Sequence, residues 1–252
     1  MQTTTALKAL IFDVDGTLAD TESAHRAAFN HAFDELGLGW HWDEALYTEL
    51  LDISGGKERV LHYWKQVNSD VKSLDGQAVQ DTVARIHELK AAHYEATVNS
   101  GDVVLRPGVL ELIDEAQSAG LQLAIATTTS PVNIAALLRR AMGPAWRHSF
   151  SAVGDASNAP LKKPHPQVYQ LILQMLQLDP RECLAFEDSG NGLKAATLAG
   201  LATVITPTQY TRHHDFGRAL HVVPDLSGVH LADLKQWHQA NWAGERLLTV
   251  EQ

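Results

Sequence analysis

Two aspartates, Asp13 and Asp15, directly follow the apolar run of residues 9–12, and a second acidic pair, Glu187 and Asp188, ends another apolar run. A single aspartate after a strand is commonly a turn former or a helix cap. Several carboxylates brought together would repel one another, and a bound divalent cation relieves that repulsion. Oxygen ligands with open coordination positions suit Mg²⁺, so the sequence predicts a Mg²⁺ site.

Thr127 and Lys163 would complete a phosphate site beside that metal. In isolation each has a plainer interpretation, as a strand-end threonine and a solvated loop lysine. Together with Mg²⁺ and the backbone N–H groups after Asp13, they would hold a phosphoryl group. One carboxylate would attack phosphorus and another would move protons. The cation is needed because a carboxylate about 4 Å from one negative charge costs about 4 kcal/mol at an effective dielectric near 20.

A parallel sheet would bring these residues together. After residue 108, apolar runs of strand length alternate with amphipathic stretches, which is typical of a parallel sheet with helices on both faces. Ligands bind beyond the carboxyl ends of such strands, so Asp13, Thr127, Asp155 and Asp188 are expected to converge there. We expect strands at residues 9–12, 121–129, 150–155, 182–188 and 201–206, and helices at 109–120, 131–143, 165–179 and 189–200.

The stretch between the first strand and the others reads differently. Its apolar spacing predicts helices at residues 21–37, 43–53, 57–67 and 78–98, and no strand. The expected fold is therefore an α/β core, residues 1–19 and 100–252, interrupted after its first strand by an all-α helical cap of residues 20–99.

Composition narrows the class of partner. The 252 residues carry a formal net charge of −10, which argues against nucleic acid or an anionic membrane and leaves a small anionic ligand open. Cys183 is the single cysteine, so no intrachain disulfide can form and a reducing compartment is the default. We find no signal peptide and no run of ~18 apolar residues. These features favour a cytoplasmic protein, expected to be a monomer, that acts on a small molecule.

Four motifs, in order, carry a family resemblance: "DVDGT", the threonine after "LAIA", "KKPHP" and "FEDSGNGLKAA". They resemble the motifs of the haloacid dehalogenase superfamily, in its phosphatase branch, and they span the whole core. The resemblance implies a Rossmann-like core with a small helical cap. It also implies that Asp13 is the nucleophile, Asp15 the general acid/base, Thr127 and Lys163 the phosphoryl ligands, and that Mg²⁺ is bound by Asp13, the backbone carbonyl of Asp15 and Asp188, with Glu187 nearby.

The cap stretch "ISGGKERV", residues 53–60, bears on the substrate. It reads either as a helix start with a solvated basic turn, or as a glycine-rich loop that meets an anion with Lys57 or Arg59. Because the core already holds one phosphate, the second interpretation implies a second anionic group on the substrate.

With "GLGWHWDEALY" and "TPTQYTRHHDF", these motifs are similar to the CbbY-type subgroup over nearly the full chain. That subgroup dephosphorylates xylulose-1,5-bisphosphate, a misfire inhibitor of Rubisco, which implies a role linked to the Calvin cycle. The resemblance implies that Glu22 and His25 contact sugar hydroxyls or orient Asp15, and that Lys57 and Arg59 meet the distal phosphate. The expected substrate-binding residues are Glu22, His25, Lys57, Arg59, Thr127, Thr128, Lys163 and Asn191.

Several alternatives stay open at this level. A beta-phosphoglucomutase-like phosphomutase would use the same aspartate pair, a general sugar-monophosphate phosphatase would not need the basic cap loop, and a silent sugar-phosphate binder would not need the nucleophile. The stretch from Tyr210 to His214 either closes the site or is an ordinary polar loop. Its "RHHDF" invites a zinc interpretation, but no second His/Cys pair has ligand spacing, so the 13 histidines are expected at the surface.

Overall fold

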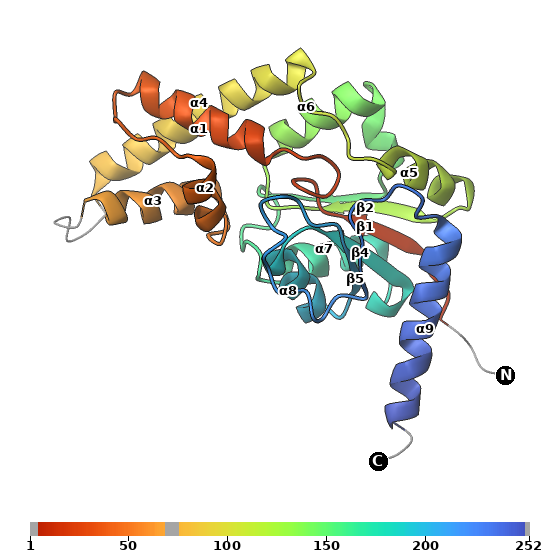
Figure 1. Ribbon diagram of the computed structural model, residues 1–252. Coiled ribbons are helices and arrows are strands. Elements are labelled where there is room, and N and C mark those ends of the chain that lie inside the picture. The colour runs from red at the N-terminus through yellow and green to blue at the C-terminus, as the bar shows by residue number, and fades with distance from the viewer. Residues whose placement is uncertain (1–4, 69–75, 250–252) are drawn as a thin grey trace.

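The computed structural model describes residues 5–68 and 76–249, and in this part of the chain the sheet has six parallel strands in the order β3-β2-β1-β4-β5-β6 (Figure 1). The first strand lies in the middle of the sheet, so the turn that follows it emerges between its two neighbours. The strands are β1 (Ala9–Phe12), β2 (Gln122–Ala126), β3 (Ala152–Gly154), β4 (Cys183–Glu187), β5 (Ala202–Ile205) and β6 (His221–Val222).

Strand β1 is apolar throughout because both faces of the sheet are covered. Alternate side chains of a strand point to opposite faces. Leu10 and Phe12 join one hydrophobic cluster, and Ala9 and Ile11 join the other; all four are fully buried. The ring of Phe12 also stacks on Phe186 of β4, with ring centroids 4.7 Å apart. This packing places the residue after Phe12 at the centre of the carboxyl edge.

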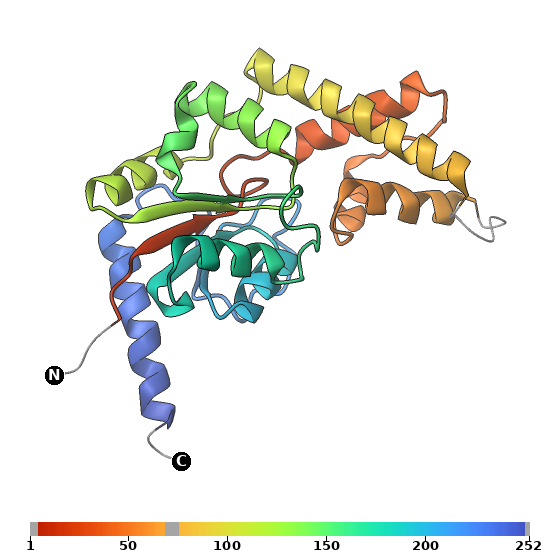
Figure 2. The same cartoon turned by 180° about the vertical axis from the view of Figure 1, so that it is seen from behind.

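Helices cover both faces of the sheet (Figure 2). On one side lie α5 (Val109–Ser118), α6 (Pro131–Met142) and α9 (Leu231–Thr249), and on the other α7 (Gln167–Leu176) and α8 (Gly190–Leu198). Helix α6 begins as expected, with Pro131 at its first position and the Ser130 hydroxyl accepting the N–H of Asn133. Two short 3₁₀ helices, η1 (Trp146–Ser149) and η2 (Pro180–Glu182), precede β3 and β4.

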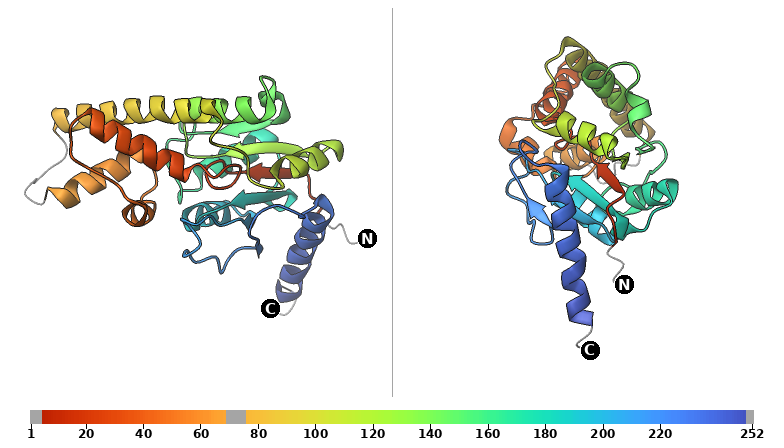
Figure 3. Two further views of the ribbon diagram at one scale, coloured as in Figure 1. Left: turned by 45° about the horizontal axis from the view of Figure 1, so that its top comes forward. Right: turned by 90° about the vertical axis from the view of Figure 1, so that its right-hand side faces the viewer.

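Four helices between β1 and α5 form what we call the cap: α1 (Glu22–Glu35), α2 (Glu44–Leu50), α3 (Gly56–Val67) and α4 (Gln77–Ser100). The rest is called the core. The cap lies at the opposite end of the sheet from α9 (Figure 3). It has a hydrophobic cluster of its own, which includes Phe29, Phe33 and Trp42 and which also takes in Tyr210 from the core.

The α/β fold with a parallel sheet is confirmed, and every expected strand and helix is present. Strand β6 and helix α9 were not predicted; β6 has only two residues, both exposed, and so carries no apolar pattern. The division at residues 20 and 99 stays a prediction, and residues 1–4 of its first segment lie outside the described chain. No described helix is both long enough and apolar enough to cross a membrane.

Candidate active site

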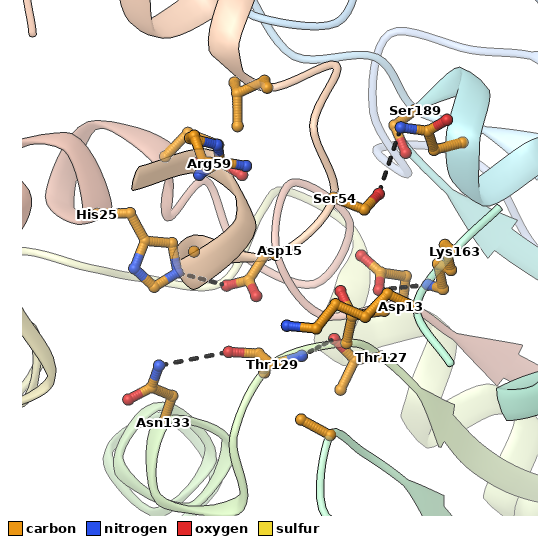
Figure 4. Close-up of a pocket in the computed structure, with 18 of the residues that line it drawn as sticks. Asp13, Asp15, His25, Ser54, Arg59, Thr127, Thr129, Asn133, Lys163 and Ser189 are labelled. Carbon is orange, nitrogen blue, oxygen red and sulfur yellow. Dashed lines mark hydrogen bonds and ion pairs between the residues drawn. The ribbon is translucent and has the colours of Figure 1, made fainter. Parts of the chain in front are cut away.

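A cavity of about 400 Å³ lies at the carboxyl edge of the sheet, between core and cap (Figure 4). The turns after β1, β2 and β4 supply its core side, since parallel strands all end at one edge of the sheet. Helices α1, α3 and α4 supply its cap side. The cavity is lined by every residue expected to act in catalysis, metal binding or substrate binding: Asp13, Asp15, Glu22, His25, Lys57, Arg59, Thr127, Thr128, Lys163, Glu187, Asp188 and Asn191.

Asp13 and Lys163 form a buried ion pair at the floor of this cavity. Lys163 Nζ lies 2.7 Å from Asp13 Oδ1 and 2.5 Å from Glu187 Oε1, and it donates to the carbonyl of Ala126 at 2.8 Å. Burial raises the pKa of Asp13 to about 7; Lys163 opposes that rise, and Glu187 adds to it. Burial lowers the pKa of Lys163, but the carboxylates of Asp13 and Glu187 outweigh it and raise that pKa.

The carboxylates of Asp13, Glu187 and Asp188 suit a divalent cation. Their ligand atoms lie within 4.8 Å of one another, and all three residues are buried. Glu187 is already engaged, because Lys163 and the Tyr169 hydroxyl both meet its Oε1. No described residue donates a hydrogen bond to the Asp188 side chain, and burial, followed by repulsion from Asp13 and Glu187, raises the pKa of Asp188 well above its usual value. Such an oxygen-only, acid-rich group fits Mg²⁺.

Gly16 is required where the turn after β1 passes the Asp188 carboxylate. Its φ is +83°, which favours glycine, and a Cβ there would lie 2.3 Å from Asp188 Oδ2. Arg106 anchors this turn, since its guanidinium donates to the carbonyls of Gly16 and Thr206. Sequence reasoning did not identify Arg106 as a site residue.

Asp15 has different surroundings from Asp13. Its Oδ1 accepts a hydrogen bond from the Thr21 hydroxyl at 2.7 Å and lies 3.1 Å from His25 Nε2. Burial acts to raise the pKa of Asp15, but His25 and Thr21 outweigh it and lower the pKa to about 2. Thr21 precedes α1 at the position where a threonine usually caps the helix, yet its hydroxyl turns to Asp15 instead.

Lys90 of α4 orients His25, and sequence reasoning missed it. Its Nζ lies 2.8 Å from His25 Nδ1. The ammonium donates to Nδ1, so the other ring nitrogen, Nε2, carries the proton and donates to Asp15. Burial lowers the pKa of Lys90 to about 8. Burial and the positive charge of Lys90 also lower the pKa of His25. Nothing in the local sequence distinguishes Lys90 from the other polar residues of its helix.

Thr127 presents a hydroxyl to the cavity at the end of β2. Its Oγ1 accepts the backbone N–H of Thr129 at 3.3 Å, which leaves the O–H hydrogen available to a ligand. Thr128 is half-buried and lines the cavity next to it.

The two basic residues of "GGKER" have different roles in the cap. Arg59 is 9% exposed, and its guanidinium donates to the carbonyls of Leu50 and Ile53 and to the Tyr47 hydroxyl. These bonds tie α3 to the end of α2. Lys57 is exposed, lines the cavity and forms no hydrogen bond or ion pair with the described residues. Of the two, Lys57 is the one left for a ligand.

Three other lining residues are bonded within the cap or between cap and core. Glu22 accepts a hydrogen bond from the Tyr47 hydroxyl at 2.8 Å. Asn191, expected to bind substrate, donates through Nδ2 to the carbonyl of Asp52 at 3.1 Å across the core–cap boundary. Lys162, which sequence reasoning passed over in favour of its neighbour, pairs with Glu58 at 3.2 Å.

Two expectations were wrong. Asp155 follows β3 but does not line the cavity; its carboxylate accepts the backbone N–H and the hydroxyl of Ser157 and so stabilises a turn. The histidines are not all at the surface, since His25 is 6% exposed and His238 is fully buried. The His25 ring stacks on Tyr94 of α4, and the His238 ring meets the carbonyl of Arg181 in η2; composition does not reveal such tertiary contacts.

A family model described as haloacid dehalogenase-like hydrolase matches residues 7–200 of the chain. The plasmid-encoded CbbY protein of Cupriavidus necator is 49% identical over 248 residues, covering 92% of this chain and 97% of that protein. The CbbY protein of Rhodobacter capsulatus is 45% identical, covering 88% and 95%. A crystal structure of a CbbY mutant from Rhodobacter sphaeroides in complex with xylulose-(1,5)bisphosphate is 40% identical, with a TM-score of 0.83 and coverage of 91% and 99%.

Proposed function

Because the chain belongs to the haloacid dehalogenase-like hydrolases and is a CbbY-type phosphatase, we propose that it hydrolyses one phosphate ester of xylulose-1,5-bisphosphate with the help of Mg²⁺. The observation that carries the substrate is the cavity itself. Asp13 and Lys163 lie at its floor, and Lys57, which pairs with none of the described residues, lines its cap side. A ligand with two phosphates would meet a cation at each end. The Rhodobacter sphaeroides complex supports the same substrate.

Asp13 is the proposed nucleophile. Its carboxylate oxygen forms a bond to phosphorus while the bond from phosphorus to the sugar oxygen breaks, which leaves an aspartyl-phosphate. Lys163 and the Thr127 hydroxyl hold the phosphoryl oxygens. Mg²⁺, when bound to Asp13, Asp188 and the carbonyl of Asp15, neutralises the negative charge of the carboxylates and the phosphate.

Asp15 is the proposed proton carrier. In the first step it donates a proton to the departing sugar oxygen; in the second it takes a proton from the water that attacks the aspartyl-phosphate, which releases inorganic phosphate. Its low pKa keeps the carboxylate ionised in the free protein, so it is able to accept a proton in the second step. An anionic phosphate beside it raises that pKa, since like charges disfavour the ionised form, and so suits the first.

The test is phosphate release from a matched pair of substrates, xylulose-1,5-bisphosphate and xylulose-5-phosphate, with and without Mg²⁺. We expect Mg²⁺-dependent release from the bisphosphate and little from the monophosphate. Lys57→Ala should raise the KM for the bisphosphate about tenfold or more and leave the KM for the monophosphate unchanged, because only the former has a second charge. Asp13→Asn is the inactive control. Equal kcat/KM for both sugars, or transfer to a second sugar hydroxyl in place of release, would refute the proposal.

We further propose that the enzyme acts as a monomer in the cytoplasm. One chain supplies all the residues that the proposed mechanism needs, and a single cysteine is compatible with a reducing compartment.

A further inference from the structure

The loop that follows β5, residues 206–216, belongs to the core but is anchored in the cap. Tyr210 is 1% exposed and packs in the hydrophobic cluster of the cap. Its ring meets Tyr47 edge-on with centroids 6.0 Å apart, and its hydroxyl lies 2.9 Å from the Ser23 hydroxyl. Opening the cap would therefore either expose Tyr210 or pull the loop along.

The same loop also reaches the segment that carries Asp188. His214 Nδ1 accepts the backbone N–H of Gly190 at 3.1 Å. Gly190 begins α8, two residues after Asp188, and a Cβ on it would lie 3.5 Å from the Cβ of His214, in ordinary contact. The ring thus packs against the start of this helix.

The geometry also assigns the tautomer of His214. Its Nδ1 lone pair is used by Gly190, so Nε2 carries the proton of the neutral ring. That nitrogen is buried and makes no hydrogen bond with described residues, and the Asp52 carboxylate of the cap lies 3.5 Å from it. A slightly closer approach of the cap would turn this contact into a hydrogen bond.

We propose that His214 is a positioning residue that couples docking of the cap to the placement of Asp188. The coupling runs from the Asp52 carboxylate through the imidazole to the Gly190 N–H, and Tyr210 holds the loop in register with the cap. Asn191 strengthens the connection, since it bonds the carbonyl of Asp52 from the same helix start. The inference rests on the proposed function, in which Asp188 binds Mg²⁺.

A metal ion held by Asp52, His213 and His214 is the competing explanation, because these residues offer ligand atoms within 4.8 Å of one another. The tautomer argues against it. A neutral imidazole binds a metal through the lone pair of an unprotonated nitrogen. Neither nitrogen of His214 has a lone pair to offer, because Nδ1 accepts the Gly190 N–H and Nε2 holds the proton.

The test measures metal affinity without substrate, which separates positioning from contact between His214 and the sugar. Binding of Mn²⁺, in place of Mg²⁺, is followed by calorimetry in the full chain. His214→Ala should weaken it several-fold, less than the ~10–100-fold that is typical when a partner bonded directly to the ligand is lost, because His214 bonds the Gly190 N–H and not the Asp188 carboxylate. His214→Asn should recover part of that loss, because its amide oxygen can accept the Gly190 N–H. Asp52→Asn should weaken Mn²⁺ binding several-fold in the wild type and have no effect in His214→Ala.

His213→Ala is the matched control, because the Gly190 N–H is bonded to His214 and not to this exposed neighbour, so Mn²⁺ affinity should stay unchanged. Unchanged affinity in His214→Ala, or additive effects of the Asp52 and His214 changes, would overturn the coupling. If Zn²⁺ binds at a second site and His213→Ala abolishes that binding, the tautomer assigned to His214 is wrong. If the wild type itself neither binds Mn²⁺ nor releases phosphate, the proposed function fails and not the coupling alone.

Discussion

Replacing Lys90 with methionine should stabilise the protein at neutral pH and weaken catalysis. Burial holds the Lys90 pKa at about 8 in the folded state, compared with 10.5 for a free side chain. Each pH unit between these values is worth about 1.4 kcal/mol, so keeping the ammonium charged costs the native state about 3 kcal/mol at pH 7. Methionine has a similar length and removes this cost.

The gain is partly offset at His25. Without Lys90 its Nδ1 loses a hydrogen-bond donor, and an unsatisfied buried acceptor costs about 1–3 kcal/mol. We therefore expect a net stabilisation of about 1 kcal/mol at pH 7. Because the pKa of Lys90 is lower in the folded state than in the unfolded state, the folded wild type binds fewer protons than the unfolded chain between pH 8 and 10.5. The stability of the wild type therefore rises with pH across that window. The advantage of Lys90→Met should accordingly fall by about 3 kcal/mol between pH 7 and 10.5.

Urea unfolding of both proteins at pH 7, 8.5 and 10, followed by tryptophan fluorescence, measures this difference. Lys57→Met is the control, because that lysine is exposed and its replacement should shift stability by less than about 0.5 kcal/mol at every pH. Lys90→Met should also lower kcat about tenfold or more, since His25 no longer has a fixed tautomer with which to orient Asp15. A destabilised variant whose difference from the wild type does not change with pH would refute the reasoning.

Three further outcomes follow from the site. Gly16→Ala should abolish phosphate release, since its Cβ would lie 2.3 Å from Asp188 Oδ2; activity near the wild-type level would contradict that contact. Lys163→Met should destabilise the protein by about 3–5 kcal/mol in urea unfolding, because it leaves Asp13 and Glu187 buried without their partner, and a change below about 1 kcal/mol would count against the pair. Metal-free protein should lose stability as pH rises from 4 to 7: the Asp13 pKa is raised to about 7, so the folded state binds more protons than the unfolded chain in this range. Thermal unfolding in a chelator checks this, and the loss should be smaller with Mg²⁺; stability that rises over the range would refute it.

The carboxyl-edge half of the site could be predicted because local pattern and topology suffice for it. Asp13, Thr127 and Asp188 each end an apolar strand, and a parallel sheet brings all such ends to one edge. Asp155 ends a strand in the same way but serves its own turn, a choice that depends on the serine two residues later. The pattern therefore identifies candidates, and neighbouring side chains decide among them.

The roles of the residues on the cap side of the site depend on packing between helices, which no local sequence pattern predicts. "GGKER" predicted a basic helix start, but only the folded cap decides that Arg59 bonds carbonyls while Lys57 bonds no residue in the described part of the chain. Lys90 reaches His25 because α4 packs along α1, and its lowered pKa comes from burial between them.

By itself, then, the sequence determined the α/β class, the helical insert and the carboxylate, threonine and lysine set of the proposed phosphoryl site, because strand period and strand-end residues are local properties. The tertiary structure alone decided how the two aspartates differ. Asp13 is paired with a buried lysine, and Asp15 is bound by Thr21 and by a histidine whose tautomer Lys90 selects. Those partners come from distant segments, and burial, which moves each pKa, exists only once the segments pack together.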